Sequence, residues 1–412
     1  MKGSVDFDPY APDIVNAGPK AWADFGRQRP LCHYRGKFDF YISSDYQDIK
    51  SGILRDNETW LYSKGTSPKM LDPRLACGMM TDPPHHHGIR AIVQRGFAPR
   101  RLERLALEID TLMDELIDAM LAMPETQGNF FDLFAMPLAA RLMCIMLGAP
   151  EGSYRLYKDW ADDFMYDIFN NVSDSAEAAQ KGQLMAESLA LLIANRRNCL
   201  EEQGVEPTLE HVGTLLPDDF ISRFICDKVD GRYLTEWEII SLLLSIINGG
   251  NETTMNLICN LLWRLLENPE LWAAVKAQPA LVPLAVEESL RFDPPVIGMF
   301  RTTAQSTELQ GEIIPANTKV MYNIAAANRD PAVWDNPDEF RLDRELATLR
   351  QHHVSFSGGS HLCLGFGLAR MEVRQVLEKL VVRLPDLRLI GEPRRAPGFN
   401  FWGHDDLPVA WD

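Results

Sequence analysis

The chain has 412 residues, of which 46% are hydrophobic and 24% charged, and its net charge is −17. This apolar fraction is ample for a large core. Glycine and proline are scattered without a repeat or a low-complexity block, so we predict a single unit over residues 1–412. The negative charge argues against nucleic acids and anionic membranes as general partners. No apolar run approaches the roughly 20 residues of a membrane span, and we expect the polar segment 1–30 to be neither a signal peptide nor an anchor.

The number and spacing of the cysteines indicate whether the protein is expected to form disulfides. They are widely spaced and odd in number: Cys32, Cys77, Cys144, Cys199, Cys226, Cys259 and Cys363. Since they form no CxxC pair, we expect a reduced, cytoplasmic environment and no disulfide framework.

Hydrophobic periodicity predicts a mainly α-helical fold with small β-sheets. Short apolar stretches predict strands over about 30–60 and in parts of 295–325 and 385–410. Segment 62–82 is loop-like and rich in methionine, which suits either an adaptable apolar surface or a loop packed onto the core. Residues 105–197 have helical spacing throughout. Thr235 and Glu238 form a capping box for a helix that runs to about Glu267, and shorter helices follow.

The middle of that long helix has an unusual composition. It reads Asn248-Gly249-Gly250-Asn251-Glu252-Thr253-Thr254. A glycine inside a helix costs about 1 kcal/mol, and buried polar side chains cost more when they are unpaired. A kinked core helix is the structural alternative, but a purely structural helix would not keep this combination. The segment is therefore a candidate functional site.

A loop of small residues surrounds the last cysteine. Phe356 precedes Cys363 by seven positions, Gly365 follows it by two, and a helical run begins directly afterwards. Glycines let the backbone approach a ligand and aim N–H groups at sulfur, and a helix N-terminus favours the thiolate. A buried cysteine in a tight turn is the alternative. The pattern favours a pocket for a large, flat ligand held by sulfur.

Three consecutive histidines open another helix after Pro84. Successive helical residues point about 100° apart, so His85, His86 and His87 cannot converge on one metal ion. His86 and Arg90, at positions i and i+4, share one face and could bind a pair of carboxylates.

Together these segments resemble the cytochrome P-450 family, from about Tyr34 to Pro408. The heme-binding loop of that family reads Phe-Gly-x-Gly-x-His/Arg-x-Cys-x-Gly. Here Phe356, Gly359, His361, Cys363 and Gly365 match, while Ser357 replaces the first glycine. The other matches are the Asp-Pro-Pro-x-His-x-x-x-Arg segment, the Ala/Gly-Gly-x-Asp/Glu-Thr signature and the Glu-x-x-Arg element. The resemblance implies the triangular-prism fold of the family, with a long central helix over the heme.

The resemblance also implies a cofactor and its ligands. The cofactor is heme b, iron protoporphyrin IX, with Cys363 as the thiolate ligand that favours O–O cleavage. The further cofactor-binding residues are His86, Arg90, Gly249, Arg301, Phe356, Gly359, His361 and Gly365. Glu252 and Thr253 are the implied catalytic pair, because Thr253 hydrogen-bonds dioxygen and Glu252 helps to relay protons.

The implied activity is that of a heme-thiolate monooxygenase. Two electrons arrive singly from a ferredoxin or flavodoxin and its reductase, so NAD(P)H acts only indirectly. The enzyme would hydroxylate or oxidatively demethylate a mid-sized hydrophobic molecule, and we expect a monomer. One alternative is a hydrogen-peroxide-driven peroxygenase of the same fold, whose members commonly lack the acid–alcohol pair. Another is a heme-binding sensor, which would not need that pair.

Further residues receive roles by position. Glu288 and Arg291 are the implied structural pair, and either Arg341 or Arg344 replaces a family arginine where this chain has Glu339. The predicted substrate pocket comprises Met79, Phe164, Ser245, Asn248, Val296, Met299 and Phe401. Because Ser245 or Asn248 lies on the face of Thr253, we expect one polar group on the substrate. A basic face for an acidic redox partner comprises Arg95, Arg100, Arg101, Arg104, Arg370 and Arg374.

Overall fold

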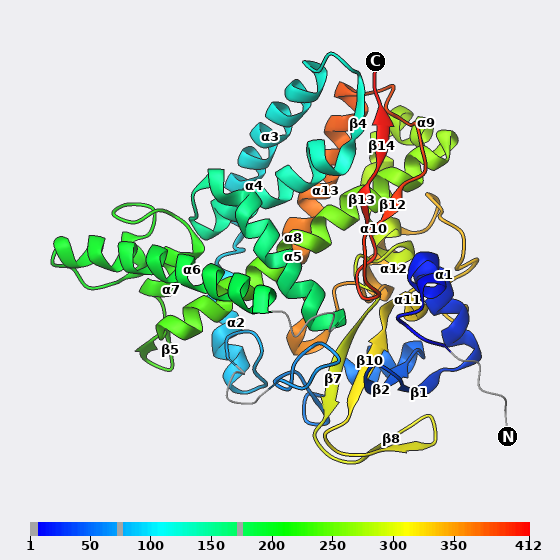
Figure 1. The fold of residues 1–412 in the computed structure, drawn as a ribbon, viewed down its shortest axis with the longest axis horizontal. Coiled ribbons are helices and arrows are strands. Elements are labelled where there is room, and N and C mark those ends of the chain that lie inside the picture. Colours follow the sequence, from blue (N-terminus) through cyan, green and yellow to red (C-terminus); the bar gives the residue numbers. More distant parts are fainter. Residues whose placement is uncertain (1–6, 72–76, 171–175) are drawn as a thin grey trace.

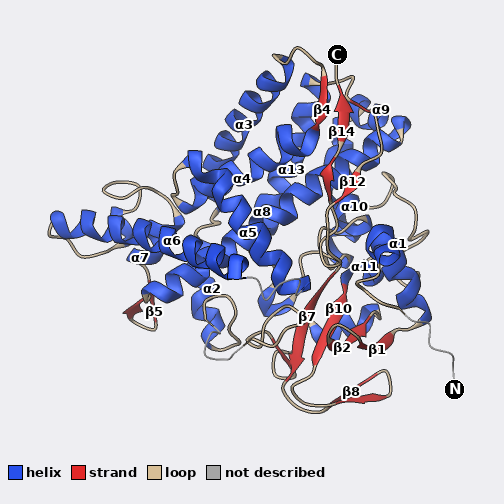
Figure 2. Ribbon diagram, in the orientation of Figure 1, coloured by secondary structure: helices blue, strands red, loops and turns tan. Residues whose placement is uncertain are grey.

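The computed structural model describes residues 7–71, 77–170 and 176–412, and it separates helices from strands in space. Helices fill most of the molecule, while the largest sheet lies at one corner beside the N-terminal helix (Figures 1 and 2). Among the described residues, no helix combines the length and the apolar character that crossing a bilayer requires.

The largest sheet confirms the strands predicted over 30–60 and 295–325. Its strand order is β1 (Leu31–Arg35), β2 (Asp39–Ser43), β10 (Lys319–Asn323), β7 (Gly298–Thr303) and β3 (Trp60–Leu61). β1 and β2 form an antiparallel hairpin in which Tyr34 lies opposite Phe40, and β10 joins β2 in parallel. Helix α1 (Pro12–Gln28) covers this sheet, since Trp22 and Phe25 share one buried cluster with Phe40.

Four smaller sheets complete the β-structure. They are β11 (Arg388–Leu389) with β14 (Pro408–Ala410) and β4 (Gln127–Asn129); β12 (Arg394–Arg395) with β13 (His404–Asp406); β5 (Lys228–Val229) with β6 (Arg232–Tyr233); and β8 (Thr307–Leu309) with β9 (Glu312–Ile314). β4 corrects the prediction of helix throughout 105–197. It is a strand because its backbone pairs with β14 near the C-terminus, a partner that local spacing does not reveal.

The remaining helices include those predicted after Pro84, within 105–197, after Glu267 and after Cys363. They are α2 (His85–Arg95), α3 (Pro99–Leu121), α4 (Met136–Leu147), α5 (Tyr154–Asn170), α6 (Ala176–Glu202), α7 (Phe220–Cys226), α9 (Pro269–Ala277), α10 (Val282–Phe292), α11 (Ile324–Ala327), α12 (Leu346–His352) and α13 (Phe366–Arg383). Of these, α7, α11 and α12 were not predicted.

The long helix α8 (Glu236–Glu267) crosses the middle of the molecule (Figure 1). Its N-terminus is the predicted capping box: the Glu238 N–H donates to Thr235 Oγ1 at 3.2 Å, and the Thr235 N–H donates to Glu238 Oε2 at 2.8 Å. Arg232 binds the same Glu238 carboxylate, and this bond is the main reason why the pKa of Glu238 falls to about 2. The helix is regular through Gly249 and Gly250.

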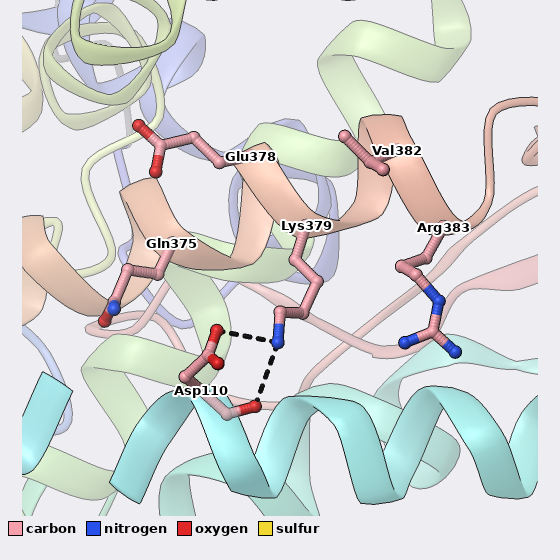
Figure 3. Close-up of a pocket in the computed structure, with 6 residues that line it drawn as sticks. All are labelled: Asp110, Gln375, Glu378, Lys379, Val382 and Arg383. Carbon is pink, nitrogen blue, oxygen red and sulfur yellow. Dashed lines mark hydrogen bonds and ion pairs between the residues drawn. The ribbon is translucent and has the colours of Figure 1, made fainter. Parts of the chain in front are cut away.

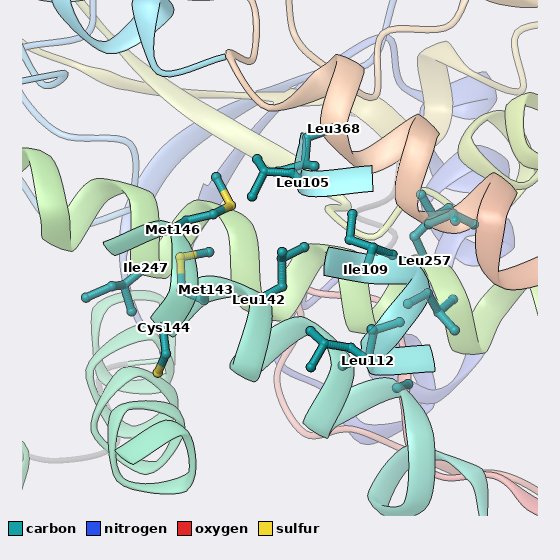
Figure 4. Packing of buried hydrophobic residues seen from close by; sticks show 14 of the residues in the cluster. Leu105, Ile109, Leu112, Leu142, Met143, Cys144, Met146, Ile247, Leu257 and Leu368 are labelled. Carbon is teal, nitrogen blue, oxygen red and sulfur yellow. The ribbon is translucent and has the colours of Figure 1, made fainter. Parts of the chain in front are cut away.

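The main core holds α8 and α13 in place. Side chains of α3, α4, α8 and α13 interdigitate there, including Leu105, Ile109, Leu142, Ile247 and Leu368 (Figure 4). Truncating such a buried leucine or isoleucine to alanine typically costs about 2–5 kcal/mol. The functional segments of α8 and the loop before α13 are therefore mounted on rigid helices.

Candidate cofactor and catalytic site

The Cys363 loop aims backbone N–H groups at the thiol. Cys363 N–H donates to Phe356 O at 2.9 Å, which closes the loop, and α13 begins three residues after the cysteine. Burial raises the pKa of the thiol, whereas the N–H groups of Gly365 and Phe366 and the charges of Arg90 and Arg370 lower it. The loop thus offers a sulfur ligand whose anionic form is stabilised by amide donors.

Two residues of this loop adopt left-handed backbone conformations. Gly359 has φ +62°, and a Cβ there would lie 2.0 Å from Leu54 O, so only glycine fits. Ser357, which stands where the family pattern has glycine, has φ 62°. Its Oγ lies 3.1 Å from the Tyr322 hydroxyl, and this hydrogen bond offsets part of the strain of a left-handed non-glycine residue.

The long helix borders open space at Gly249. Although Gly249 lies mid-helix and Ile247 beside it is fully buried, Gly249 is exposed, and a Cβ there would meet no atom within 4 Å. Cys363 also has an exposed side, although protein atoms surround its sulfur closely enough to affect its pKa. A helix position without a side chain that borders open space, and an accessible thiol, suit a flat group such as heme.

Polar side chains from four segments gather beside this loop. The rings of His86 on α2 and His361 lie 4.1 Å apart, and His361 stacks on Tyr62 at 4.0 Å. The Arg301 guanidinium on β7 lies 4.5 Å from the centre of the Tyr62 ring. Arg90, one turn after His86, lowers the pKa of both histidines. Sequence reasoning missed Tyr62 because nothing in its neighbourhood marks it.

Several polar atoms of this cluster are buried without a hydrogen-bond partner among the described residues: both ring nitrogens of His86, Nε2 of His361 and Nη1 of Arg90. Burial lowers the pKa of His86 to about 4 and that of His361 to about 2, so both rings are neutral at pH 7. Asp82 lies 3.9 Å from His361 Nε2, too far for a hydrogen bond.

Unsatisfied buried donors beside cations are costly unless an anion completes them. Carboxylates are acceptors only, and they match this donor set. The cluster therefore fits the two propionates of heme.

The acid–alcohol pair lies on α8 next to the open space. Thr253 Oγ1 donates to Gly249 O at 2.7 Å, and the residue remains partly exposed. Glu252 accepts a weak bond from Asn256 at 3.5 Å and lies 3.8 Å from Lys158 Nζ. Both side chains are partly accessible.

Lys158 and Asp162 on α5 connect to this pair and were missed by the sequence reasoning. Lys158 Nζ binds the carboxylate of Asp162 one turn further along the helix. Burial raises the pKa of Asp162, the Lys158 charge opposes this rise and the nearby Glu252 carboxylate adds to it. A carboxyl group that holds its proton more tightly than a free aspartate thus lies beside Glu252.

The predicted polar pocket residues differ in how they are satisfied. Ser245 Oγ donates to Ser241 O at 2.8 Å within the helix, so it needs no ligand. Asn248 Oδ1 is buried and has no partner among the described residues. Asn400, which is 1% exposed, has neither amide atom satisfied by a described residue. Asn248 is thus the better polar contact of the two, and Asn400 is an addition that the sequence did not reveal.

The apolar pocket residues form two groups. Val296 pairs with Phe401 in an antiparallel bridge, and Met299 packs against the same clusters as these residues. Met79 packs against the main core, and its loop docks on α8 through a hydrogen bond from Ser241 Oγ to a carbonyl of that loop. Phe164 lies on α5, but its side chain is outside the described residues.

Glu288 and Arg291 form a fully buried bidentate pair, with bonds of 2.7 and 2.8 Å. The missing family arginine is replaced by Arg344, whose Nε donates to Glu288 Oε1 at 3.1 Å. Arg341 offers only its backbone N–H to Glu288, at 2.9 Å, and its side chain pairs with exposed aspartates. The open choice between Arg341 and Arg344 is settled in favour of Arg344.

The predicted basic face requires correction. Arg101 is 4% exposed and binds Asp218, and Arg370 binds the buried Glu287, so neither presents its charge to a partner. Arg104 shares Asp218 with Arg101, and Arg95 binds Asp227.

Four arginines of that set keep exposed side chains. Arg95 and Arg104 are each 46% exposed despite their ion pairs. Arg100 is exposed, and no ion pair is described for it among residues 7–71, 77–170 and 176–412. Arg374 is about half exposed and pairs with Glu378 one turn along α13. Arg101 and Arg370 lie inward because their carboxylate partners, Asp218 and Glu287, lie there. The sequence alone does not show which arginines have such partners.

A surface groove of about 320 Å³ runs between α3 and α13 at the far end of α13 from Cys363 (Figure 3). Lys379 crosses it and binds Asp110 at 2.6 Å. Arg383 binds Asp114 and Asp118 on α3. These ion pairs join the two helices, and both cations of the groove are bound by aspartates of α3.

Comparisons with known proteins give consistent matches. The sequence model of the family described as Cytochrome P450 matches residues 33–384. The steroid C26-monooxygenase of Mycolicibacterium smegmatis is 32% identical over 381 residues, covering 92% of this chain and 89% of that protein. The erythromycin C-12 hydroxylase of Saccharopolyspora erythraea is 31% identical over 366 residues, covering 88% and 87%. The solved structure of cytochrome P450 CYP109Q5 from Chondromyces apiculatus superposes with a TM-score of 0.83 at 27% identity, covering 98% of each chain.

Proposed function

Because the chain belongs to the cytochrome P450 family and is a monooxygenase with the mainly α fold predicted from its sequence, we propose a specific assignment of its residues and partners. It is a heme-thiolate enzyme that hydroxylates, or oxidatively demethylates, a mid-sized hydrophobic molecule bearing one polar group. The family implies a heme cofactor, and heme b is the form proposed here.

Four buried polar groups would bind this cofactor in addition to Cys363. His86, Arg90, Arg301 and His361 would bind its propionates. The first two and His361 keep buried nitrogen atoms without a partner among the described residues, and the Arg301 cation lies beside them. Gly249 would lie against its open face, where a side chain would obstruct it. When bound, a thiolate-ligated heme supplies the chemistry of dioxygen activation.

Proton supply is the role proposed for the acid–alcohol pair. Thr253 Oγ1 donates to the carbonyl of the exposed Gly249, and the adjacent Glu252 lies 3.8 Å from Lys158 of the Lys158–Asp162 pair on α5. Burial raises the pKa of Asp162 toward the pH at which the enzyme works, which suits a proton relay. A peroxide-driven enzyme or a sensor would have no use for this pair, which argues against both alternatives.

The electrons are proposed to come from a separate ferredoxin or flavodoxin and its reductase, so NAD(P)H would act only through them. The exposed members of the predicted docking face that support this are Arg95, Arg100, Arg104 and Arg374. The cytoplasmic location and the monomeric state stay predictions from the sequence.

The substrate proposal rests on satisfied and unsatisfied groups. Val296, Met299 and Phe401 supply apolar surface, while Asn248 and Asn400 hold buried amide atoms that no described residue satisfies. Leaving such an atom unpaired costs about 1–3 kcal/mol, which a polar group of the ligand would recover. Two relatives are named for their substrates, a steroid and erythromycin. Both substrates are bulky, largely apolar molecules that carry polar groups.

The main support for this proposal is the group of donors beside the Cys363 loop that no described residue satisfies. An optical titration tests it. The purified ferric protein is mixed with steroids, macrolides, terpenoids and fatty acids, and the Soret band is recorded. A low-to-high-spin shift identifies the ligand class. The reduced protein with carbon monoxide should show thiolate ligation, and its absence would remove the assignment of Cys363.

A matched pair of variants tests the polar contacts. Asn248→Leu and Asn400→Leu should each weaken the affinity of the true substrate about tenfold or more, because each removes a polar contact worth roughly 1–3 kcal/mol. Ser245→Ala is the control and should leave affinity unchanged, since Ser245 is satisfied within its helix. Equal losses in all three variants would contradict the polar-group proposal.

A further inference from the structure

A buried carboxylate behind the cysteine loop gathers donors from three segments. Glu287 on α10 is 1% exposed. Its Oε1 accepts from Arg370 Nε on α13 at 2.6 Å and from Arg350 Nε on α12 at 3.1 Å. Its Oε2 accepts from Arg370 Nη2 at 2.9 Å and contacts His353 Nε2 at 3.0 Å. Arg370 therefore makes the bidentate contact, and Arg350 makes a single contact from the protein surface.

The protonation of His353 follows from its contacts. Its Nδ1 accepts the Ser355 N–H at 3.3 Å, so the ring proton lies on Nε2, which donates to Glu287. Burial lowers the pKa of His353, and the ring is therefore neutral. The hydrogen bonds of His353 and Arg370 outweigh the effect of burial and hold the pKa of Glu287 at about 2, so Glu287 is charged. The cluster thus contains one anion and, at its inner side, one cation.

The Arg370 guanidinium lies on the side of the cluster that faces the cysteine loop. Its central carbon is 4.6 Å from the ring centre of Phe356 and 5.6 Å from that of Phe366. Phe356 accepts the Cys363 N–H, and Phe366 is the first residue of α13. Glu287 lies behind Arg370 as seen from this loop. The ion pair is accordingly oriented with its positive end toward the thiol, and charges are weakly screened in such an interior.

We propose that Arg370, held by Glu287, is a positioning residue that sets the reduction potential of the group bound to Cys363. A cation on the protein side of the thiolate stabilises the reduced state, which carries one more negative charge, and so raises the potential. This assignment rests on the proposed binding of heme at Cys363. It replaces the docking role that the sequence predicted for Arg370.

Potentiometric reduction of the heme-loaded protein tests the proposal. Arg370→Gln should lower the equilibrium constant for one-electron reduction about tenfold, a shift of ~59 mV to more negative potential. Glu287→Gln should shift the potential in the opposite direction, because it removes the anion and leaves the cation. Arg370→Lys, which keeps the charge without the bidentate geometry, should remain near the wild-type potential.

Arg350→Gln is the matched control. It removes a cation from the same carboxylate, but the Arg350 side chain is 52% exposed and approaches from the surface. Its potential should equal that of the wild type. If Arg370 had only a structural role, the Arg370 and Glu287 variants would retain less heme, but their reduction potentials would not shift in opposite directions.

If Arg370→Gln and Glu287→Gln both keep the wild-type reduction potential, or both shift it in the same direction, the inference is overturned. If Arg370→Gln does not retain heme, the Glu287→Gln and Arg370→Lys potentials decide between the two roles. Failure of the wild-type protein to show thiolate ligation with carbon monoxide would overturn the proposed function itself. Normal ligation with unshifted potentials would overturn only the role of Arg370.

Discussion

Arg344→Gln should destabilise the protein because Arg344 completes a buried carboxylate. Arg344 Nε donates to Glu288 Oε1 at 3.1 Å, and its side chain is only 9% exposed. The same guanidinium donates to Asp335 O at 2.7 Å and Asn336 O at 2.9 Å. Glu288 is fully buried and also binds Arg291. The loss of one donor therefore leaves the buried Glu288 carboxylate less well stabilised.

The expected loss follows from these bonds. A hydrogen bond to a charged group contributes about 1.5–3 kcal/mol, and each neutral bond near the surface contributes about 0.5–1.5 kcal/mol or less. Glutamine is shorter and uncharged, and it cannot replace them together. We expect a loss of about 2–4 kcal/mol in the free energy of unfolding, a large share of the 5–15 kcal/mol that is typical of proteins.

Urea unfolding followed by circular dichroism measures this loss as a shift in midpoint at unchanged slope. Arg341→Gln is the control. It keeps the backbone N–H that binds Glu288 and removes only exposed pairs with Asp335 and Asp343, so its midpoint should not move measurably. An Arg341→Gln midpoint that falls as far as that of Arg344→Gln would refute the assignment of Arg344.

Three further predictions concern the site and its sheet. Thr253→Ala should retain heme and the rate of reduction but divert turnover to hydrogen peroxide, because the proposed proton route loses its hydroxyl; undiminished coupling of product to NAD(P)H would contradict it. Gly249→Ala should stabilise the heme-free protein by up to about 1 kcal/mol, since a Cβ there meets no atom within 4 Å, yet weaken carbon monoxide binding to the loaded protein; an unaltered affinity would place the cofactor elsewhere. Burial lowers the pKa of Lys319 to about 7 from 10.5, so the unfolded chain binds the extra proton and stability should rise between pH 7 and 10.5. Lys319→Met should abolish that rise, and a persisting rise would assign it to other groups.

Local sequence determined the elements that carry their own signals. The capping box of Thr235 and Glu238 marks the start of α8, and both hydrogen bonds are present. The Cys363 loop could be recognised because glycines stand at fixed spacings around one cysteine, and at Gly359 the backbone conformation requires glycine. His86 and Arg90 shared a face by helical periodicity alone. In each case a few neighbouring residues contain the whole physical cause.

Tertiary structure decided which polar groups are satisfied. Ser245 and Asn248 look equivalent in sequence, but only Asn248 keeps a buried atom without a described partner. Asn400 gave no signal, because its burial depends on how the C-terminal segment packs. β4 is a strand only because a segment some 280 residues later pairs with it.

Charge assignment depended most on the fold. Arg100 and Arg101 are adjacent in the chain, yet one is exposed and the other is buried against Asp218. Arg370 was predicted to face a redox partner, but Glu287 draws it inward behind the cysteine loop. A sequence shows that a residue is charged, whereas the position of its counter-charge, and hence its burial, is set by segments far apart in the chain that the core brings together.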